Sequence, residues 1–85
     1  MWTLHYSQEA KSYFVDNEPY TFDLLVRIEE LKLDAEAIPS EGLTTLDDPN
    51  EPDLYLWLVL DHVILLRRVT SDNSLYIIAV RPLDP

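Results

Sequence analysis

The chain contains no cysteine and a single glycine, Gly42. Without cysteine it can form neither a disulfide framework nor a thiolate metal site, and one glycine cannot build a glycine-rich phosphate-binding loop. Long apolar runs are also missing. The longest spans about seven residues, far fewer than the ~20 that a transmembrane helix needs, and the N-terminus has no basic region followed by an apolar one. We therefore predict a soluble, unprocessed cytoplasmic protein without membrane contact.

Positive charge is scarce as well. Sixteen acidic residues stand against six basic ones, which gives a net charge of -10 and a pI near 4.2. No Lys or Arg occurs between Lys32 and Arg67. Proteins that bind nucleic acid usually neutralise several phosphates with a basic patch, so the composition disfavours direct nucleic-acid binding. A protein partner that is basic, or that is met through apolar surface, agrees better with this charge.

The C-terminal third of the chain predicts a β-meander. Residues 54–60, 63–70 and 75–81 are short runs rich in Val, Ile, Leu, Tyr and Trp, each bounded by polar turn residues. Asp61-His62 is the predicted hairpin turn between the first two strands, and residues 71–74 form the second turn. These strands do not alternate apolar with polar residues, which indicates that both faces of the sheet are apolar.

The N-terminal part predicts one strand and two helices. Residues 2–6 alternate, so Trp2, Leu4 and Tyr6 share a face. Ser7 is the predicted N-cap of a helix that reaches about Asp16 and buries one apolar stripe, Ala10, Tyr13 and Phe14. A second helix is expected from about Pro19 to Leu33. Its predicted stripe is Phe22, Leu25, Ile28 and either Leu31 or Lys32, widened by Leu24 and Val26.

Residues 34–53 differ in composition from the rest of the chain. They hold seven acids, no base and three of the six prolines. We predict an ordered but irregular crossover, pinned by Ile38, Leu43 and Leu46. Eighty-five residues are enough for one hydrophobic core, so residues 1–85 are expected to form a single domain.

The order β-α-α-β-β-β, with Tyr6-Ser7-Gln8-Glu9-Ala10 after the first strand, resembles the RelE/ParE superfamily of bacterial type II toxin–antitoxin proteins. The Ser7-x-x-Ala10 helix start, the strand led by Tyr55 and the late segment 78–81 carry the resemblance, which covers nearly the whole chain. It implies an α+β fold in which a helical hairpin packs on a small antiparallel sheet. It also implies an antitoxin-like partner.

The sequence departs from the family where the chemistry lies. Members that cut ribosome-bound messenger RNA carry Lys or Arg on the Tyr-led strand, where this chain has Leu56 and Leu58. Such cleavage needs cations that stabilise the phosphate transition state and a group that moves protons. Weak catalytic candidates are Arg68, Arg81 and His62. We therefore favour a protein that is not an enzyme; if it is one, the resemblance implies a ribosome-dependent mRNA endoribonuclease.

Other polar residues have simpler explanations. Asp61 beside His62 suggests a base with its orienting carboxylate, but neighbours in a tight turn usually point apart. His5 is expected to have a structural or surface role, and Arg67 and Arg68 are expected to pair with acids of the crossover. Carboxylates of the acidic loop suggest calcium, but their spacing departs from the calcium-loop pattern, so we predict neither metal nor cofactor; these residues are Asp47, Asp48, Glu51 and Asp53.

An apolar second face of the sheet suggests how the protein works. In the register of the family, the partner-binding residues are Leu56, Leu58, Ile64, Leu66, Ile77 and Ala79. A strict two-residue turn at Asp61-His62 instead places Val63 and Leu65 on the face of Leu56 and Leu58. The sequence is compatible with both registers.

Three hypotheses follow from the sequence. The first is a RelE/ParE-like protein that lacks most nuclease residues and binds another protein, or a second copy of itself, through this apolar sheet face. The second is a functional toxin that acts on ribosome-bound message or on DNA gyrase and is neutralised by an antitoxin. The third is an unrelated small α+β adaptor or subunit of a larger complex.

Overall fold

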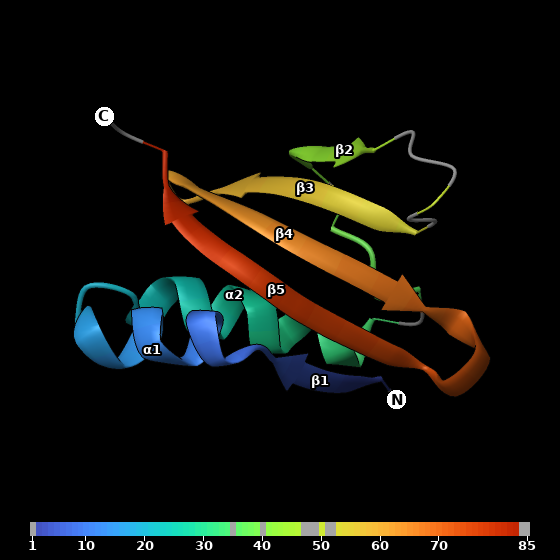
Figure 1. Cartoon of the computed structure of the whole chain (residues 1–85), viewed down its shortest axis with the longest axis horizontal. Helices are drawn as coiled ribbons and strands as arrows, with labels where there is room; N and C mark the ends of the chain where they lie inside the picture. The colour runs from blue at the N-terminus through green and yellow to red at the C-terminus, as the bar shows by residue number, and fades with distance from the viewer. Residues whose placement is uncertain (1, 35, 40, 47–49, 51–52, 84–85) are drawn as a thin grey trace.

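The computed structural model describes residues 2–34, 36–39, 41–46, 50 and 53–83. A curved five-stranded sheet has the strand order β1-β5-β4-β3-β2, with β1 parallel to β5 and the other neighbours antiparallel (Figure 1). The elements are β1 (Thr3–Tyr6), α1 (Gln8–Asp16), α2 (Phe22–Glu30), β2 (Leu43–Thr45), β3 (Leu54–Val59), β4 (His62–Val69) and β5 (Ser74–Pro82), with short 3-10 turns at Leu31–Leu33 and Thr70–Asp72. The predicted α+β class, with a helical hairpin and a C-terminal meander, is confirmed.

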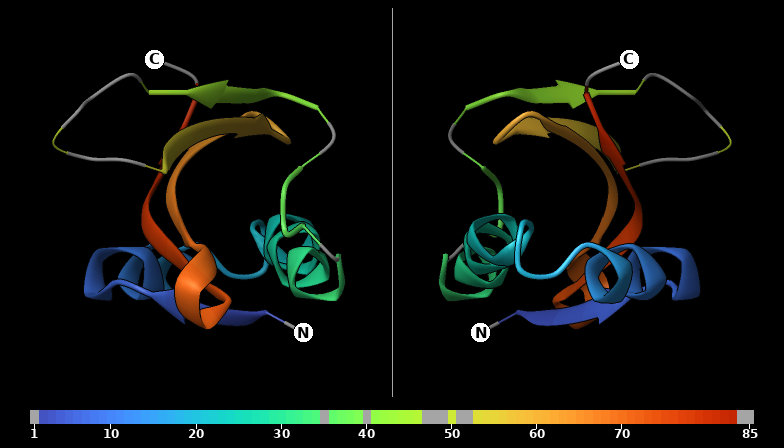
Figure 2. Two further views of the ribbon diagram at one scale, coloured as in Figure 1. Left: turned by 90° about the vertical axis from the view of Figure 1, so that its right-hand side faces the viewer. Right: turned by 90° about the vertical axis from the view of Figure 1, so that its left-hand side faces the viewer.

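The sheet bends around the second helix. In Figure 2, α2 lies inside the curve, while α1 continues from the end of β1 and packs against β5. The core fills the concave side of the sheet. Its buried apolar side chains are Trp2, Ala10, Phe14, Leu24, Ile28, Leu31, Ala37, Trp57, Ile64, Leu66, Leu75, Ile77 and Val80.

The first helix has the predicted bounds because Ser7 caps it. The Ser7 hydroxyl accepts a hydrogen bond of 3.0 Å from the Ala10 N–H and donates one of 2.6 Å to the Ile78 carbonyl. The cap satisfies a free N–H at the helix start and ties α1 to β5. Ala10 and Phe14 are buried, as the stripe predicts, and Tyr13 packs against the core.

The second helix begins later than predicted. Backbone bonds from Thr21 to Asn17 and from Phe22 to Pro19 close a separate turn first, so the α-helix starts at Phe22. The prediction that Phe22 faces the core is wrong, since this ring is 65% exposed. The buried stripe consists of Leu24, Ile28 and Leu31.

The predicted turn at Asp61-His62 is wrong by one residue. Leu60 and Asp61 occupy the turn, with φ of 47° and 59°, and Val59 pairs with His62. Two positive φ values define a type I′ turn, which suits the twist of a hairpin. Leu56 therefore faces Leu65 across the β3–β4 ladder.

A strand lies within the segment predicted to be irregular. Residues Leu43–Thr45 form β2, which pairs with β3 and adds an edge to the sheet. Gly42 precedes it with φ of +75°, and its carbonyl accepts a 2.8 Å bond from the Leu58 N–H. A Cβ at Gly42 would lie 2.3 Å from the Leu58 carbonyl oxygen. The single glycine of the chain thus lies where the crossover passes close to the backbone of β3.

Candidate protein-binding face

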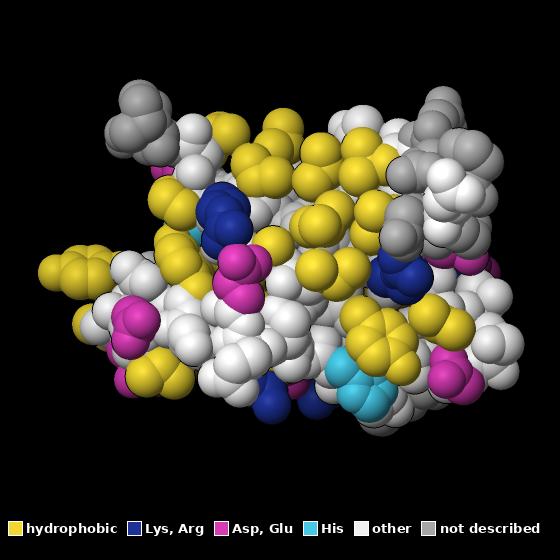
Figure 3. Space-filling view, viewed as in Figure 1, with side chains coloured by type: hydrophobic (Ala, Val, Ile, Leu, Met, Phe, Trp, Pro, Cys, Tyr) yellow, Lys and Arg dark blue, Asp and Glu magenta, His cyan; other side chains and the backbone are white. Residues whose placement is uncertain are grey.

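The convex side of the sheet carries an open patch of aliphatic side chains. We name the convex apolar face by its residues Leu56, Leu58, Val63, Leu65 and Ala79, which the strand register places on one side. Leu58 is 49% exposed and the others are half-buried. Figure 3 shows hydrophobic side chains gathered over β3, β4 and β5 on this side. Such a patch is the kind of surface that partner proteins cover.

Half of the residues predicted to bind a partner lie on the other side. Ile64, Leu66 and Ile77 are 0%, 1% and 0% exposed and belong to the core. The register of the family, which placed them beside Leu56 and Leu58, is therefore wrong for this chain. Leu56, Leu58 and Ala79 stay on the convex side, and Val63 and Leu65 join them as the alternative register predicts.

A shift in the pairing between β4 and β5 explains why Ile77 faces the core. Leu65 pairs with Ala79 and Leu66 with Ile77, so Ile78 is the extra residue of a β-bulge. The bulge lets Ile77 and Val80, which are three positions apart, both point into the core. A strict alternation along β5 would place these two residues on opposite faces.

Polar contacts border the convex apolar face at both ends. Arg81, paired with Val63 in the ladder, forms a 2.9 Å ion pair with Glu9 of α1. At the other end, the ring of His5 stacks on Tyr76 with 4.7 Å between ring centroids. His5 is thus placed as an aromatic neighbour, consistent with the structural role expected from the sequence.

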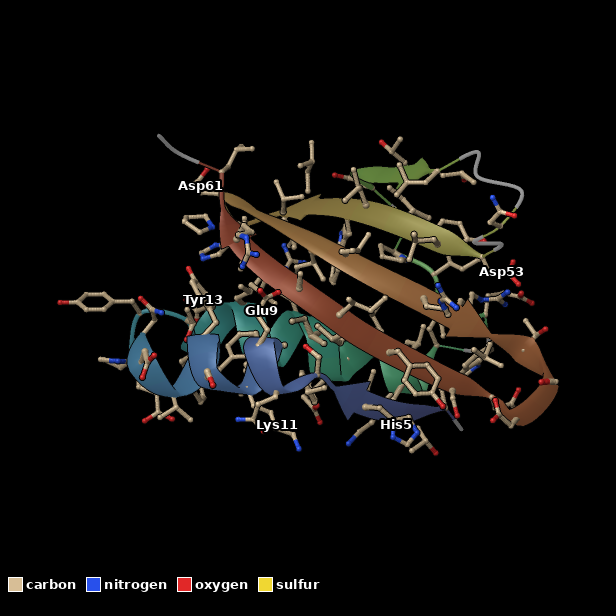
Figure 4. The ribbon with its side chains drawn as sticks, viewed as in Figure 1. His5, Glu9, Lys11, Tyr13, Asp53 and Asp61 are labelled. Atoms are coloured by element: carbon tan, nitrogen blue, oxygen red, sulfur yellow. The ribbon has the colours of Figure 1, made fainter. Side chains whose placement is uncertain are left out.

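Sequence reasoning missed the partner of His62. Nε2 of this ring lies 2.8 Å from the Tyr13 hydroxyl, and Nδ1 lies 2.8 Å from the Leu60 carbonyl oxygen. Both ring nitrogens are therefore engaged, and neither of the two hydrogen bonds described for His62 goes to the Asp61 carboxylate. Figure 4 shows Tyr13 and Glu9 on α1 pointing toward the end of the sheet where Asp61 lies. No local signal reveals this contact, because Tyr13 and His62 lie 49 positions apart.

Arg68 has a structural role. Its Nε donates a 2.7 Å bond to the Glu36 carbonyl, its Nη2 lies 3.2 Å from the Glu36 carboxylate, and its guanidinium stacks 4.9 Å from the Trp2 ring centre. The prediction that it pairs with an acid of the crossover is confirmed. Arg68 and His62 lie near opposite ends of β4, about 20 Å apart at 3.3 Å per residue. The three catalytic candidates therefore do not form one site.

The acidic loop lies largely outside the described residues, which include neither Asp47, Asp48 nor Glu51. Asp53 is described; it has φ of 63° and its carbonyl accepts a 3.0 Å bond from the Arg68 N–H. Within the described part of the chain, no group of three His, Asp or Glu side chains is arranged to hold a metal ion. No helix in the same part is long and apolar enough to cross a membrane.

Comparison with solved structures identifies the fold as that of RelE-like toxins. The chain superposes with a TM-score of 0.78 on a chain from the crystal structure of the archaeal RelE–RelB complex of Pyrococcus horikoshii, at 14% identity over 96% of this chain and 94% of that one. A second match is the toxin–antitoxin complex RelBE2 of Mycobacterium tuberculosis, with a TM-score of 0.70 and 15% identity over 95% and 96% of the two chains. No protein-family model and no curated protein sequence matches the chain.

Proposed function

We propose that the chain acts by binding a protein partner of the antitoxin kind through the convex apolar face. The exposed Leu58 and the half-buried leucines and valine around it are the observation that supports the proposal. Fully burying one such side chain contributes about 1.5 to 3 kcal/mol. A few half-exposed ones covered together thus contribute a substantial part of the ~8 kcal/mol of a micromolar complex. The two structures described above are a RelE–RelB complex and a toxin–antitoxin complex, which supports this class of partner.

Affinity measurements on matched variants test the proposal. The probe is the product of the reading frame adjacent to the one that encodes this chain, purified and titrated by calorimetry. Leu56→Ser and Leu65→Ser, which face each other across the ladder, are expected to weaken binding about tenfold each, or about 1.4 kcal/mol. Leu33→Ser is the control, because Leu33 is 71% exposed and lies off the sheet.

The outcome separates three cases. Weaker partner binding by both Leu56→Ser and Leu65→Ser, with unchanged binding by Leu33→Ser, supports the convex apolar face as the binding site. Equal effects in all three variants, or no binding by the unaltered chain, contradict the proposal. A doubled mass of the chain alone in light scattering, abolished by Leu65→Ser, assigns this face to a second copy of the chain instead.

A second candidate function is that of an active toxin. The fold shared with two toxin–antitoxin structures favours it, and inhibition of gyrase by protein contact requires no catalytic cations. Controlled induction in a bacterial culture, followed by mapping of message cleavage and plasmid supercoiling, tests it. Growth arrest supports toxicity, and the two assays separate ribosome from gyrase. Normal growth with the soluble protein present contradicts it.

The net charge of -10 supports a role in which the chain does not itself bind nucleic acid. The absence of cysteine agrees with the cytoplasm as the proposed compartment.

A further inference from the structure

A second surface with a different chemistry lies between α2, the crossover and β3, close to the start of β2. The C-terminal half of α2, the crossover and the end of β3 border an open pocket of about 490 Å³. We name it the edge pocket. Its volume falls within the range of about 300–1,000 Å³ typical of ligand sites, which is room for several side chains. The edge pocket borders the core at Leu31 and Trp57 and meets the convex apolar face at Leu58, but Val63, Leu65 and Ala79 of that face do not line it.

The edge pocket is lined by both apolar and acidic side chains, and polar groups make up the larger part of its exposed surface. Ile38, Trp57 and Val59 supply apolar surface, and Trp57 is almost fully buried behind it. The exposed carboxylates of the rim belong to Glu30, Asp34 and Glu41, against the single guanidinium of Arg27. A side chain with an aliphatic stem and a cationic head, that is Lys or Arg, matches both parts.

The backbone of the neighbouring β2 edge points to a peptide as the occupant. Within the described residues, β2 pairs with β3 alone and ends the sheet. Glu41 of the rim comes just before Gly42 and β2. A strand edge presents N–H and C=O groups that an added peptide segment satisfies. A peptide pairs with both the N–H and the C=O groups of such an edge, whereas a small cation binds only the carbonyl oxygens.

We propose that the edge pocket binds a basic, partly apolar peptide segment of the partner protein, with Lys or Arg side chains over Ile38 and Trp57 and their charges at Glu30, Asp34 and Glu41. The inference rests on the proposed function, since it gives the partner a second contact. The charge of the whole chain favours the same occupant, because the net charge of -10 attracts a basic segment.

A synthetic peptide tests the inference without the natural partner. The probe is a peptide of about 15 residues made of Lys, Leu and Ala, and the reference is the same peptide with Glu in place of Lys. Fluorine NMR of the chain labelled with 5-fluorotryptophan reads the binding site. Trp57 lines the pocket, whereas Trp2 lies against Arg68, so only the Trp57 resonance is expected to move.

Charge-matched variants separate the pocket from the general field. The triple variant Glu30→Gln/Asp34→Asn/Glu41→Gln is expected to bind the basic peptide about tenfold more weakly. The control, Asp16→Asn/Glu18→Gln/Asp72→Asn, removes the same charge from exposed positions outside the pocket and is expected to cost less than about threefold. Ile38→Ser is expected to weaken the peptide as well, and Leu33→Ser to leave it unchanged.

Four results would overturn the inference: no binding of the basic peptide, equal losses in both charge variants, a Trp57 resonance that does not move, or displacement of the peptide by spermidine at equal concentration. Leu65→Ser separates a failure of the edge-pocket inference from a failure of the proposed function, because Leu65 lies on the convex apolar face and does not line the pocket. If Leu65→Ser binds the peptide normally but not the partner, both proposals stand. If it binds the partner normally, only the function assigned to the convex apolar face fails.

Discussion

The Tyr6 hydroxyl donates a hydrogen bond of 2.6 Å to Oε2 of Glu29 and so joins β1 to α2. Burial, the bond to Glu29 and its negative charge raise the pKa of Tyr6 far above its usual value of 10.0. The same bond, helped by Lys32 at 3.1 Å and opposed by partial burial, holds the pKa of the Glu29 carboxyl below 4.5. Each group therefore stabilises the fold only in one charge state: Tyr6 as a phenol and Glu29 as a carboxylate.

Tyr6→Phe is expected to lower the free energy of unfolding by about 1 kcal/mol near neutral pH. A depressed carboxyl pKa contributes stability above 4.5 that is lost as the pH falls through the lower folded value. A raised phenol pKa contributes stability below 10.0 that is lost as the pH rises toward the higher folded value. Urea unfolding over a series of pH values measures the free energy of unfolding of the unaltered chain and of Tyr6→Phe. The difference between these two free energies should therefore narrow at both low and high pH. Tyr76→Phe is the control, and a difference that stays constant with pH would contradict the expectation.

Gly42→Ala is expected to destabilise the fold by about 1 to 3 kcal/mol. Gly42 has φ of +75°, and an added Cβ meets the Leu58 carbonyl at 2.3 Å, so β2 must move away from β3. Urea unfolding measures the loss, and hydrogen exchange of the Leu58 amide, which donates to the Gly42 carbonyl, locates it. Thr44→Ala on exposed β2 should change stability by less than about 0.5 kcal/mol. Unchanged protection of the Leu58 amide in Gly42→Ala would argue against this cause.

The first half of the fold could be predicted because its signals are local. Ser7 caps the helix that follows it, and the alternation of Trp2, Leu4 and Tyr6 sets the faces of β1. The predicted start of α2 was wrong because the turn at 17–21 is held by backbone hydrogen bonds, which the apolar periodicity of the sequence does not reveal. β2 was missed because three residues among acids and prolines are too short for a strand pattern.

The candidate site could be predicted only in part. Runs of apolar residues on both sides of a strand do not specify which side faces the core. That choice depends on the turn at Leu60–Asp61 and on the bulge opposite Leu65 and Leu66. Neither turn residue is Gly or Asn, the usual markers of positive φ. Contacts such as Tyr13 with His62 depend on the completed fold and leave no trace in spacing.

Substitutions on the core side of β3 and β4 should reduce stability more than substitutions on the convex side. Ile64→Ala is expected to cost about 2 to 5 kcal/mol of stability, because Ile64 is 0% exposed in the core. Leu58→Ala, on a side chain that is 49% exposed, should cost less than about 1 kcal/mol. Thermal or urea unfolding of the two variants checks this. The reverse order would restore the register of the family and remove Leu58 from the convex apolar face.

The arginine candidates are expected to respond differently to replacement. Arg68→Lys removes the two-point contact with Glu36 and the stacking on Trp2, and its side chain is only 12% exposed; we expect a loss of about 1 to 3 kcal/mol. Arg81→Ala breaks an ion pair whose side chains are 62% and 49% exposed, so stability should change by less than about 1 kcal/mol. Urea unfolding should accompany any toxicity assay of these variants. Loss of toxicity in Arg81→Ala with unchanged stability would then indicate a direct role for Arg81, whereas the same loss in a destabilised Arg68→Lys would reflect unfolding.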